Sequence, residues 1–213
     1  IFREGTNNAI FYSRRDANSV NYTLLTKVDA NGTAIFTKRL DSIYSNSAMQ
    51  LGSDYIILGK RNWQATDSVY YLMRVDASLN TIWSTQLTYT SNTQLTISGI
   101  TNNSIYIGGL NGRGGSLLSA FDVSGVLKWS KAYYSTQAYN MGNVAVGVVY
   151  KSNHLYVIGN SYDSSYVYSN LISTLDTNGN FIRNRVSVYN TGFSYADFEV
   201  NADTSIFSVG IID

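Results

Sequence analysis

Short apolar stretches alternate with polar turns along the whole chain, and they repeat as one unit. In four segments an apolar run ends at an Asp, a turn rich in Asn, Ser and Gly follows, and a bulky residue stands seven positions after the Asp. The shared residues are Asp29, Asp76, Asp122 and Asp176. They are 46 to 54 positions apart, a period that is typical of propeller blades.

Each of these segments predicts a strand, a tight turn and a second strand. The Asp carboxylate is expected to accept hydrogen bonds from the backbone of its own turn, and a glycine supplies the positive φ that the turn needs. These glycines are Gly32, Gly125 and Gly179; Leu79 stands at the same position of the second segment.

The bulky residue after each turn predicts how the sheets pack. Phe36, Trp83 and Trp129 are expected to lie between adjacent sheets. Arg183 stands where the other segments have Phe or Trp, which predicts a less well filled contact at that unit.

A second apolar segment precedes each turn segment, and it occurs five times. In four of the five copies it ends in a glycine, namely Gly59, Gly108, Gly159 and Gly210. With one more short strand before it, each unit holds four strands. In the third unit they are expected at about 94–101, 104–110, 116–122 and 126–134.

This pattern predicts an all-β fold, a β-propeller of four-stranded antiparallel blades with about four and a half blades present. No segment has a helical period with a cap and a stop. We expect one partial propeller over 1–213, with blades at roughly 1–40, 41–90, 91–135 and 136–190 and a half blade at 191–213. The incomplete last unit predicts a fragment of a larger propeller.

Composition limits the possible partners. The net charge is +1, which predicts neither nucleic acid nor acidic lipid as a partner, and no apolar stretch is long enough to insert into a membrane. The absence of cysteine excludes disulfides, thiolate metal sites and a thiol nucleophile. The small polar residues favour an extracellular or cell-surface location, and the glycosylation sequons at Asn21, Asn31 and Asn102 are compatible with it.

Motifs that could carry chemistry are weak. A Ser–His–Asp triad would have to use the single histidine, His154, and no Gly-x-Ser-x-Gly elbow accompanies it. The turns at Asp29 and Asp176 lack the ligands of a calcium loop, so turn capping is the better interpretation. The glycine-rich segment Gly108–Gly115 precedes a strand rather than a helix, which favours a hairpin loop over a phosphate site. We therefore expect no catalytic, cofactor-binding or metal-binding residues.

Two surface features remain as candidates for binding. The basic pairs Arg14-Arg15 and Lys60-Arg61 occupy equivalent positions, either as a positive patch on one rim or as solvated loop charges. Tyrosines gather at Tyr133-Tyr134, at Tyr139 and over 162–168, where they suit either strand filling or the binding of protein or sugar.

The pattern Leu-x-x-x-Asp-x-x-Gly-x-x-x-Trp, preceded by Ile105-Tyr-Ile-Gly108, resembles two related propeller repeats. One is the bacterial SBBP repeat, and the other is the quinoprotein-type repeat of PQQ enzymes and of an outer-membrane assembly scaffold. The variable stretches Gly109–Gly115 and Asn160–Asn170 look more like the first. Such blades serve enzymes, scaffolds and surface proteins alike.

We expect a non-catalytic scaffold or interaction module that binds protein partners, either copies of itself or other subunits. Carbohydrate binding is one alternative. A quinone-dependent dehydrogenase is another, although the chain has only Glu4 and Glu199 as glutamates and lacks the vicinal cysteines that accompany the quinone in such enzymes. A hydrolase or lyase acting in the central channel is a third, but the innermost strand candidates are neutral.

Overall fold

The computed structural model describes residues 2–4, 7–15, 21–41, 43–60, 68–89, 94–111, 115–133, 144–162, 168–189, 193–201 and 205–212. The chain divides into two compact units. Unit 1 holds Ile1–Ser91 with Val123–Val126, and unit 2 holds Asn92–Asp122 with Leu127–Asp213.

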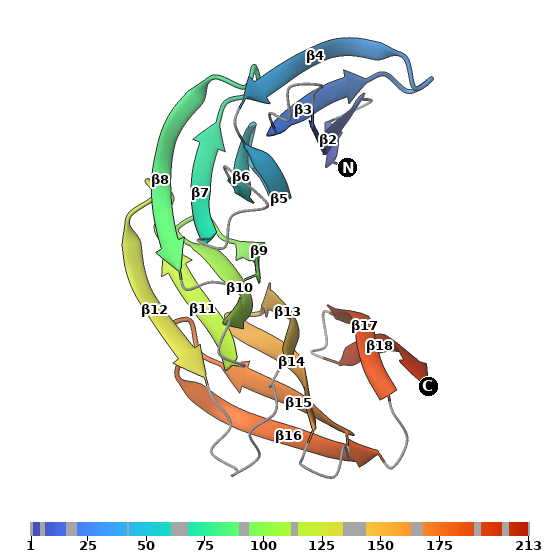
Figure 1. Cartoon of the computed structure of the whole chain (residues 1–213), viewed down its shortest axis with the longest axis vertical. Helices are drawn as coiled ribbons and strands as arrows, with labels where there is room; N and C mark the ends of the chain where they lie inside the picture. The colour runs from blue at the N-terminus through green and yellow to red at the C-terminus, as the bar shows by residue number, and fades with distance from the viewer. Residues whose placement is uncertain are drawn as a thin grey trace. The chain divides into compact units, whose positions relative to one another are not determined.

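Unit 1 contains two four-stranded antiparallel sheets whose strands pair in chain order (Figure 1). The first sheet consists of β1 (Phe2–Glu4), β2 (Asn7–Arg15), β3 (Asn21–Val28) and β4 (Ala34–Asp41). The second consists of β5 (Tyr44–Leu51), β6 (Asp54–Lys60), β7 (Ser68–Val75) and β8 (Thr81–Tyr89). Both are simple meanders, since each strand pairs with the strand that follows it in the chain.

Unit 2 repeats the meander twice more. The third sheet consists of β9 (Gln94–Ile100), β10 (Ile105–Asn111), β11 (Gly115–Phe121) and β12 (Leu127–Tyr133). The fourth consists of β13 (Val144–Lys151), β14 (His154–Tyr162), β15 (Tyr168–Leu175) and β16 (Phe181–Tyr189). A two-stranded sheet of β17 (Phe193–Val200) and β18 (Ile206–Ile212) follows.

The predicted all-β fold with four-stranded blades is confirmed. The described residues contain no helix, and therefore none that could cross a membrane. In the third sheet, the predicted strands match β9 to β12 to within one residue at each end. Each four-stranded sheet is a β-propeller blade, because its strands run as one antiparallel meander and its face packs on the next sheet of its unit.

The same irregularity recurs where the third and fourth strands meet. The pairing of β3 with β4 shifts between Lys27 and Val28, immediately before the Asp turn, and the other three blades shift at the matching place. A bulge increases the local twist of a pair of strands. The repeat therefore fixes a bend at the same end of every blade.

The core of unit 1 lies between its two blades. Side chains from the first blade, such as Ala9 and Leu25, are fully buried against Tyr55, Ile57 and Met73 of the second. A polar seam continues this contact. Thr23, fully buried, donates to the carbonyl of Ile43 (2.8 Å), and the Ser45 amide donates to the hydroxyls of Thr23 (2.9 Å) and Ser13 (2.8 Å).

The core of unit 2 lies between the third and fourth blades. Tyr106 and Leu118 pack against Val148, Leu155 and Val157. Two glycines allow the close approach of β9 and β10 to β13. A Cβ added at Gly108 would lie 2.5 Å from Val148 Cγ2, and one added at Gly99 would lie 2.6 Å from Tyr150 Cβ.

Candidate functional site

The Asp turns are built from carboxylate-to-backbone hydrogen bonds. The Asp29 carboxylate accepts from the amides of Asn31 and Thr33, both at 2.9 Å. The carboxylates of Asp76 and Asp176 accept from the amides two and four residues further on, at 2.8 to 2.9 Å. Asp122 begins the corresponding turn of the third blade. The predicted calcium alternative requires several more oxygen ligands than one carboxylate supplies.

These hydrogen bonds also hold the acids in their charged form. The pKa of Asp76 is lowered, first by the Asn80 side-chain amide and then by the Asn80 backbone amide. The pKa of Asp176 is lowered by the same two groups of Asn180, the backbone amide first. Their contribution to stability is therefore present above the ordinary Asp pKa and is lost as the pH falls through the lowered one.

The residue three positions after each Asp adopts a positive φ. The values are +82° at Gly32, +86° at Gly125 and +72° at Gly179. Leu79 has a φ of 60° although it carries a side chain, and this side chain is buried in the core of unit 1 at 2% exposure. The leucine thus keeps a turn conformation that favours glycine and adds a side chain to the core.

The tryptophans reach forward onto the next Asp turn. Trp83 Nε1 donates to the carbonyl of Val123 (3.0 Å) within unit 1, and Trp129 Nε1 donates to the carbonyl of Thr177 (3.1 Å) within unit 2. Both acceptors directly follow the Asp of their turn. Phe36 stands at this position of the first blade, 37% exposed, and has no donor to offer.

A second contact from the same strand reinforces the first. Lys38 Nζ donates to the carbonyl of Ser78 (2.9 Å) and to Asn80 Oδ1 (3.0 Å), and Lys131 Nζ donates to Asn180 Oδ1 (2.7 Å). Tyr133 donates to the carbonyl of Gly179 at 2.7 Å. We call the contact of a fourth strand with the Asp turn of the next blade the forward clasp.

Arg183 makes a different contact. It is exposed, and its Nε lies 3.4 Å from Thr174 Oγ1 within its own sheet. The Arg183 guanidinium therefore contacts its own sheet, whereas Trp83 and Trp129 donate to the Asp turn of the next blade.

The second-strand glycines are equivalent in three sheets, and the third blade is offset. Gly59 and Gly159 pair with the residue five positions before the Asp, namely Tyr71 and Leu171. In the third blade the residue five positions before the Asp is Leu117, and it pairs with Gly109. Gly108 pairs with Leu118, which is the next residue of the third strand. Gly59, Gly159 and Gly210 each lie beside a bulge of the first strand, between residues 45 and 47, 145 and 147, and 195 and 197. In the third blade the bulge lies opposite Tyr106 and Ile107 instead.

The remaining sequence candidates do not come together as a site. His154 begins β14, and its Nδ1 lies 2.8 Å from the carbonyl of Ser152 in the adjoining turn. Within the described part of the chain, no group of three or more His, Cys, Asp or Glu residues could hold a metal. Asn31 and Asn102 are exposed in turns, whereas the side chain of Asn21 lies outside the described residues.

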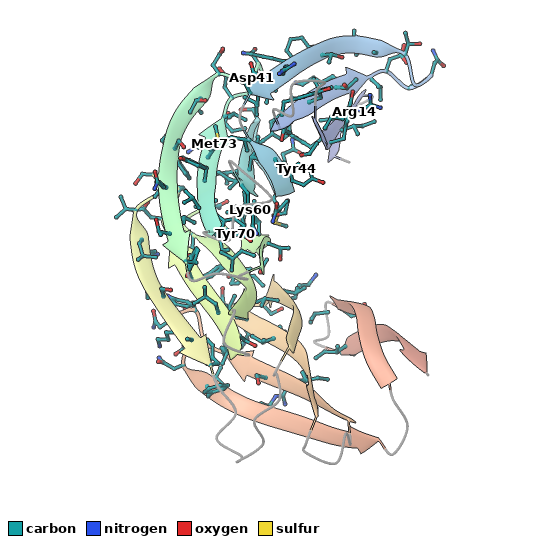
Figure 2. All side chains as sticks on the ribbon, viewed as in Figure 1. Arg14, Asp41, Tyr44, Lys60, Tyr70 and Met73 are labelled. Atoms are coloured by element: carbon teal, nitrogen blue, oxygen red, sulfur yellow. The ribbon has the colours of Figure 1, made fainter. Side chains whose placement is uncertain are left out.

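The basic residues rest on aromatic rings of their own blades. Lys60 Nζ lies 4.8 Å from the centre of the Tyr70 ring, and burial lowers the pKa of this lysine. Both residues are labelled in Figure 2. Arg14 lies 5.9 Å from the Tyr12 ring. The side chains of Arg15 and Arg61 fall outside the described residues, as do those of Tyr134, Tyr139 and 162–168.

A cavity of about 210 Å³ lies between the third and fourth blades of unit 2. It is lined by Thr101, Ser104, Tyr106, Ala120, Lys128, Trp129, Tyr150, Thr177 and Asn178. Tyr106 and Tyr150 are stacked with ring centres 5.2 Å apart, and Trp129 is tilted against Tyr106 at 6.4 Å. Lys128 Nζ donates to Ser104 Oγ at 3.0 Å. Except for Trp129, these residues were not among the predicted site residues.

The turns at one end of the two blades position the cavity wall. Thr101 and Ser104 close the β9–β10 turn, in which the Ser104 amide donates to Thr101 Oγ1 at 2.9 Å. Thr177 and Asn178 come from the Asp176 turn, which the forward clasp of Trp129 holds in place. Burial raises the pKa of the Tyr106 phenol, and a hydrogen bond with Ser104 acts in the opposite direction. The wall is therefore preorganised by backbone turns.

Comparison with known proteins gives a likeness at the level of solved structures alone. No protein-family model and no curated protein matches the chain. Among solved structures, a subtype N10 neuraminidase-like protein of A/little yellow-shouldered bat/Guatemala/060/2010 is similar to 87% of the chain, with a TM-score of 0.45 and 11% sequence identity. The chain covers 60% of the length of that protein.

The Tyr133 phenol should titrate far above an ordinary tyrosine. Burial, and secondly the negative charge of Asp176, raise its pKa to about 12, against about 10 in the unfolded chain. The unfolded state then loses this proton first, so the stability linked to Tyr133 is complete below pH of about 10 and declines as the pH rises toward about 12. Nuclear magnetic resonance of ¹³C-labelled tyrosine checks the value, and Tyr133→Phe should reduce the alkaline loss of stability. A Tyr133 resonance that titrates with the bulk of the tyrosines would contradict this expectation.

Proposed function

We propose that the chain is a non-catalytic β-propeller module that binds protein partners, as part of a secreted or surface protein or of a large assembly. The residues that define its repeat stabilise the described blades. The Asp carboxylates accept hydrogen bonds within their turns, the glycines adopt positive φ, and the tryptophans donate hydrogen bonds to the Asp turn of the next blade. This use of the repeat supports a scaffold, since a repeat of this kind leaves exposed positions free to vary for binding.

The observation that carries the proposal is an exposed apolar residue at the start of the fourth strand of each four-stranded blade, namely β4, β8, β12 and β16. Isolated apolar residues on a surface are ordinary, but here the exposure recurs at the start of the fourth strand in four blades, and in three of them at the same position, six residues after the Asp. The first or second residue of the strand is apolar and more than half exposed at Ile35 (58%), Ile82 (51%), Leu127 (52%), Phe181 (54%) and Ile182 (53%). A protein partner would cover such side chains, because burying them on binding is favourable.

The test compares two double variants of unit 1. Ile35→Ser with Ile82→Ser removes the exposed apolar groups, and Thr37→Ser with Ser84→Ala changes exposed polar groups on the same strands. Each isoleucine contributes about 1.5–3 kcal/mol when fully buried by a partner. Proteins captured from the native extracellular fraction by the wild type should therefore be depleted at least about tenfold with the isoleucine variant. The control variant should capture them at the wild-type level.

Equal capture by both variants would overturn the proposal. Addition of pyrroloquinoline quinone and calcium provides the second arm of the experiment. A bound-quinone absorbance with alcohol oxidation would support the dehydrogenase alternative instead, since the cofactor carries that chemistry.

A further inference from the structure

The cavity in unit 2 exists because a long side chain of the repeat is missing there. Two positions before the Asp, the blades carry Lys27, Arg74, Ala120 and Thr174 in turn. All four pair with the bulky residue of the fourth strand, so they are equivalent by register. Ala120 is the smallest of them, and it is 1% exposed in the cavity wall.

The second blade shows what fills this space elsewhere. Arg74 forms an ion pair with Asp54, with Nη2 at 2.6 Å and Nε at 2.8 Å from Oδ2, and its Nη1 reaches the carbonyl of Val123 at 3.4 Å. Asp54 and Ser104 are equivalent by strand register. Asp54 directly precedes Tyr55, which pairs with Val75 at the end of β7, and Ser104 directly precedes Ile105, which pairs with Phe121 at the end of β11. The third blade thus replaces a space-filling ion pair with Ala120 and Ser104.

The wall that remains combines aromatic surface with hydrogen-bonding groups. Trp129 and Tyr150 are only partly buried, so part of their ring surface is accessible. Around them stand the Lys128 ammonium, the hydroxyls of Thr101 and Ser104, and the Asn178 amide. An ammonium group donates, an amide both donates and accepts, and a hydroxyl does both.

This lining excludes several classes of ligand. A cation is disfavoured, since Lys128 is the charged residue of the lining and no carboxylate balances it. A purely apolar ligand would leave the polar groups unpaired. The volume of about 210 Å³ lies below the range of roughly 300–1,000 Å³ for drug-sized ligands, so a nucleotide or an oligomer does not fit.

We propose that this cavity binds a single pyranose ring of a glycan. A pyranose has C–H groups on its faces and hydroxyls around its edge, which match an aromatic wall rimmed by donors and acceptors. The electron-rich face of an aromatic ring attracts the partly positive C–H groups. The hydroxyls, or a carboxylate in an acidic sugar, interact with Lys128, Ser104 and Asn178. The inference is independent of the apolar positions tested above, because neither Ile35 nor Ile82 lines the cavity.

The experiment uses saturation-transfer NMR on the full chain with glucose, galactose, mannose, N-acetylglucosamine and glucuronate. At least one sugar should bind saturably in the millimolar range, as expected for a ligand of few atoms. The double variant Ser104→Asp with Ala120→Arg recreates the ion pair of the second blade in the cavity and should abolish binding. Lys128→Met, at an exposed position that tolerates substitution, should weaken binding at least about fivefold through loss of a charge-assisted hydrogen bond.

Ala132→Arg is the matched control, since it adds the same side chain at an exposed position of β12 outside the cavity lining. It should leave binding unchanged. Thermal unfolding establishes that each variant is folded. The proposal is overturned if no sugar in the panel binds saturably, or if binding survives in both the filled-cavity variant and Lys128→Met.

Discussion

Replacing Gly125 with alanine is expected to lower the free energy of unfolding by about 3 kcal/mol, the sum of backbone strain and overpacking. The residue has a φ of +86°, which alanine adopts only at a cost. The added Cβ would also lie 2.7 Å from Trp83 Cε3 and 3.0 Å from Thr85 Oγ1. The indole cannot move away freely, because its Nε1 donates to the Val123 carbonyl in the same turn.

Gly32→Ala separates these two causes. Gly32 occupies the same turn position with a φ of +82°, but an added Cβ would meet nothing within 4 Å. Only the backbone strain remains, so the expected loss is about 1 kcal/mol. Urea unfolding of both variants measures the difference. Equal losses for Gly32→Ala and Gly125→Ala would show that the forward clasp imposes no steric demand on the turn.

Leu79→Gly is expected to destabilise the protein by about 2 kcal/mol even though it restores the glycine of the repeat. The leucine side chain is 2% exposed and packs with Ala9, Leu25 and Tyr55 in the core of unit 1. Its removal costs about 3 kcal/mol in lost burial and cavity formation, and relief of the positive φ returns about 1 kcal/mol.

Leu79→Ala is the control, since it deletes most of the side chain but keeps a Cβ at a φ of 60°. It should lose about 1 kcal/mol more than Leu79→Gly, because the strain stays. Urea unfolding measures the free energies of unfolding of the wild type, Leu79→Gly and Leu79→Ala, which should decrease in that order. A Leu79→Gly protein at least as stable as the wild type would contradict the packing role of Leu79.

The blade unit could be predicted from the sequence because its signals are local. An Asp followed by a polar turn residue and glycine specifies its own turn, and alternating apolar residues on either side specify the two strands. The turn that begins at Asp29 forms in this way, and the backbone amide of Asp29 donates to the carbonyl of Thr33 at 2.9 Å. Strand ends in the third blade followed from the same local pattern.

The cavity could not be predicted, because it depends on residues that meet only in the folded unit. Tyr106, Ala120 and Tyr150 come from β10, β11 and β13. Taken alone, Ala120 looks like one more small residue in a strand. Its significance appears only when the strand register aligns it with Arg74, whose partner Asp54 is replaced by Ser104.

The offset of Gly108 has a similar cause. Sequence alignment of the Ile-x-x-Gly segments places Gly108 with Gly59, yet the ladder pairs Gly109 at the equivalent position. Both ladders are regular, so the difference lies in the second strand itself: Gly59 is four residues after Tyr55, which pairs with the last residue of the third strand, whereas Gly108 is three residues after the equivalent Ile105. In the third blade this shift presents Gly108 to Val148, where a side chain would not fit.

The forward clasp gives the chain a direction of assembly. Its hydrogen bonds run from an earlier fourth strand to a later turn, from Lys38 to Ser78, from Trp83 to Val123 and from Trp129 to Thr177. On a ribosome the earlier strand is synthesised first, so each new hairpin emerges beside a surface that already carries its donor. Growth of the protein during translation would then proceed by templating, in which each finished sheet holds the last turn of its successor and shortens the time for which that final hairpin is unprotected.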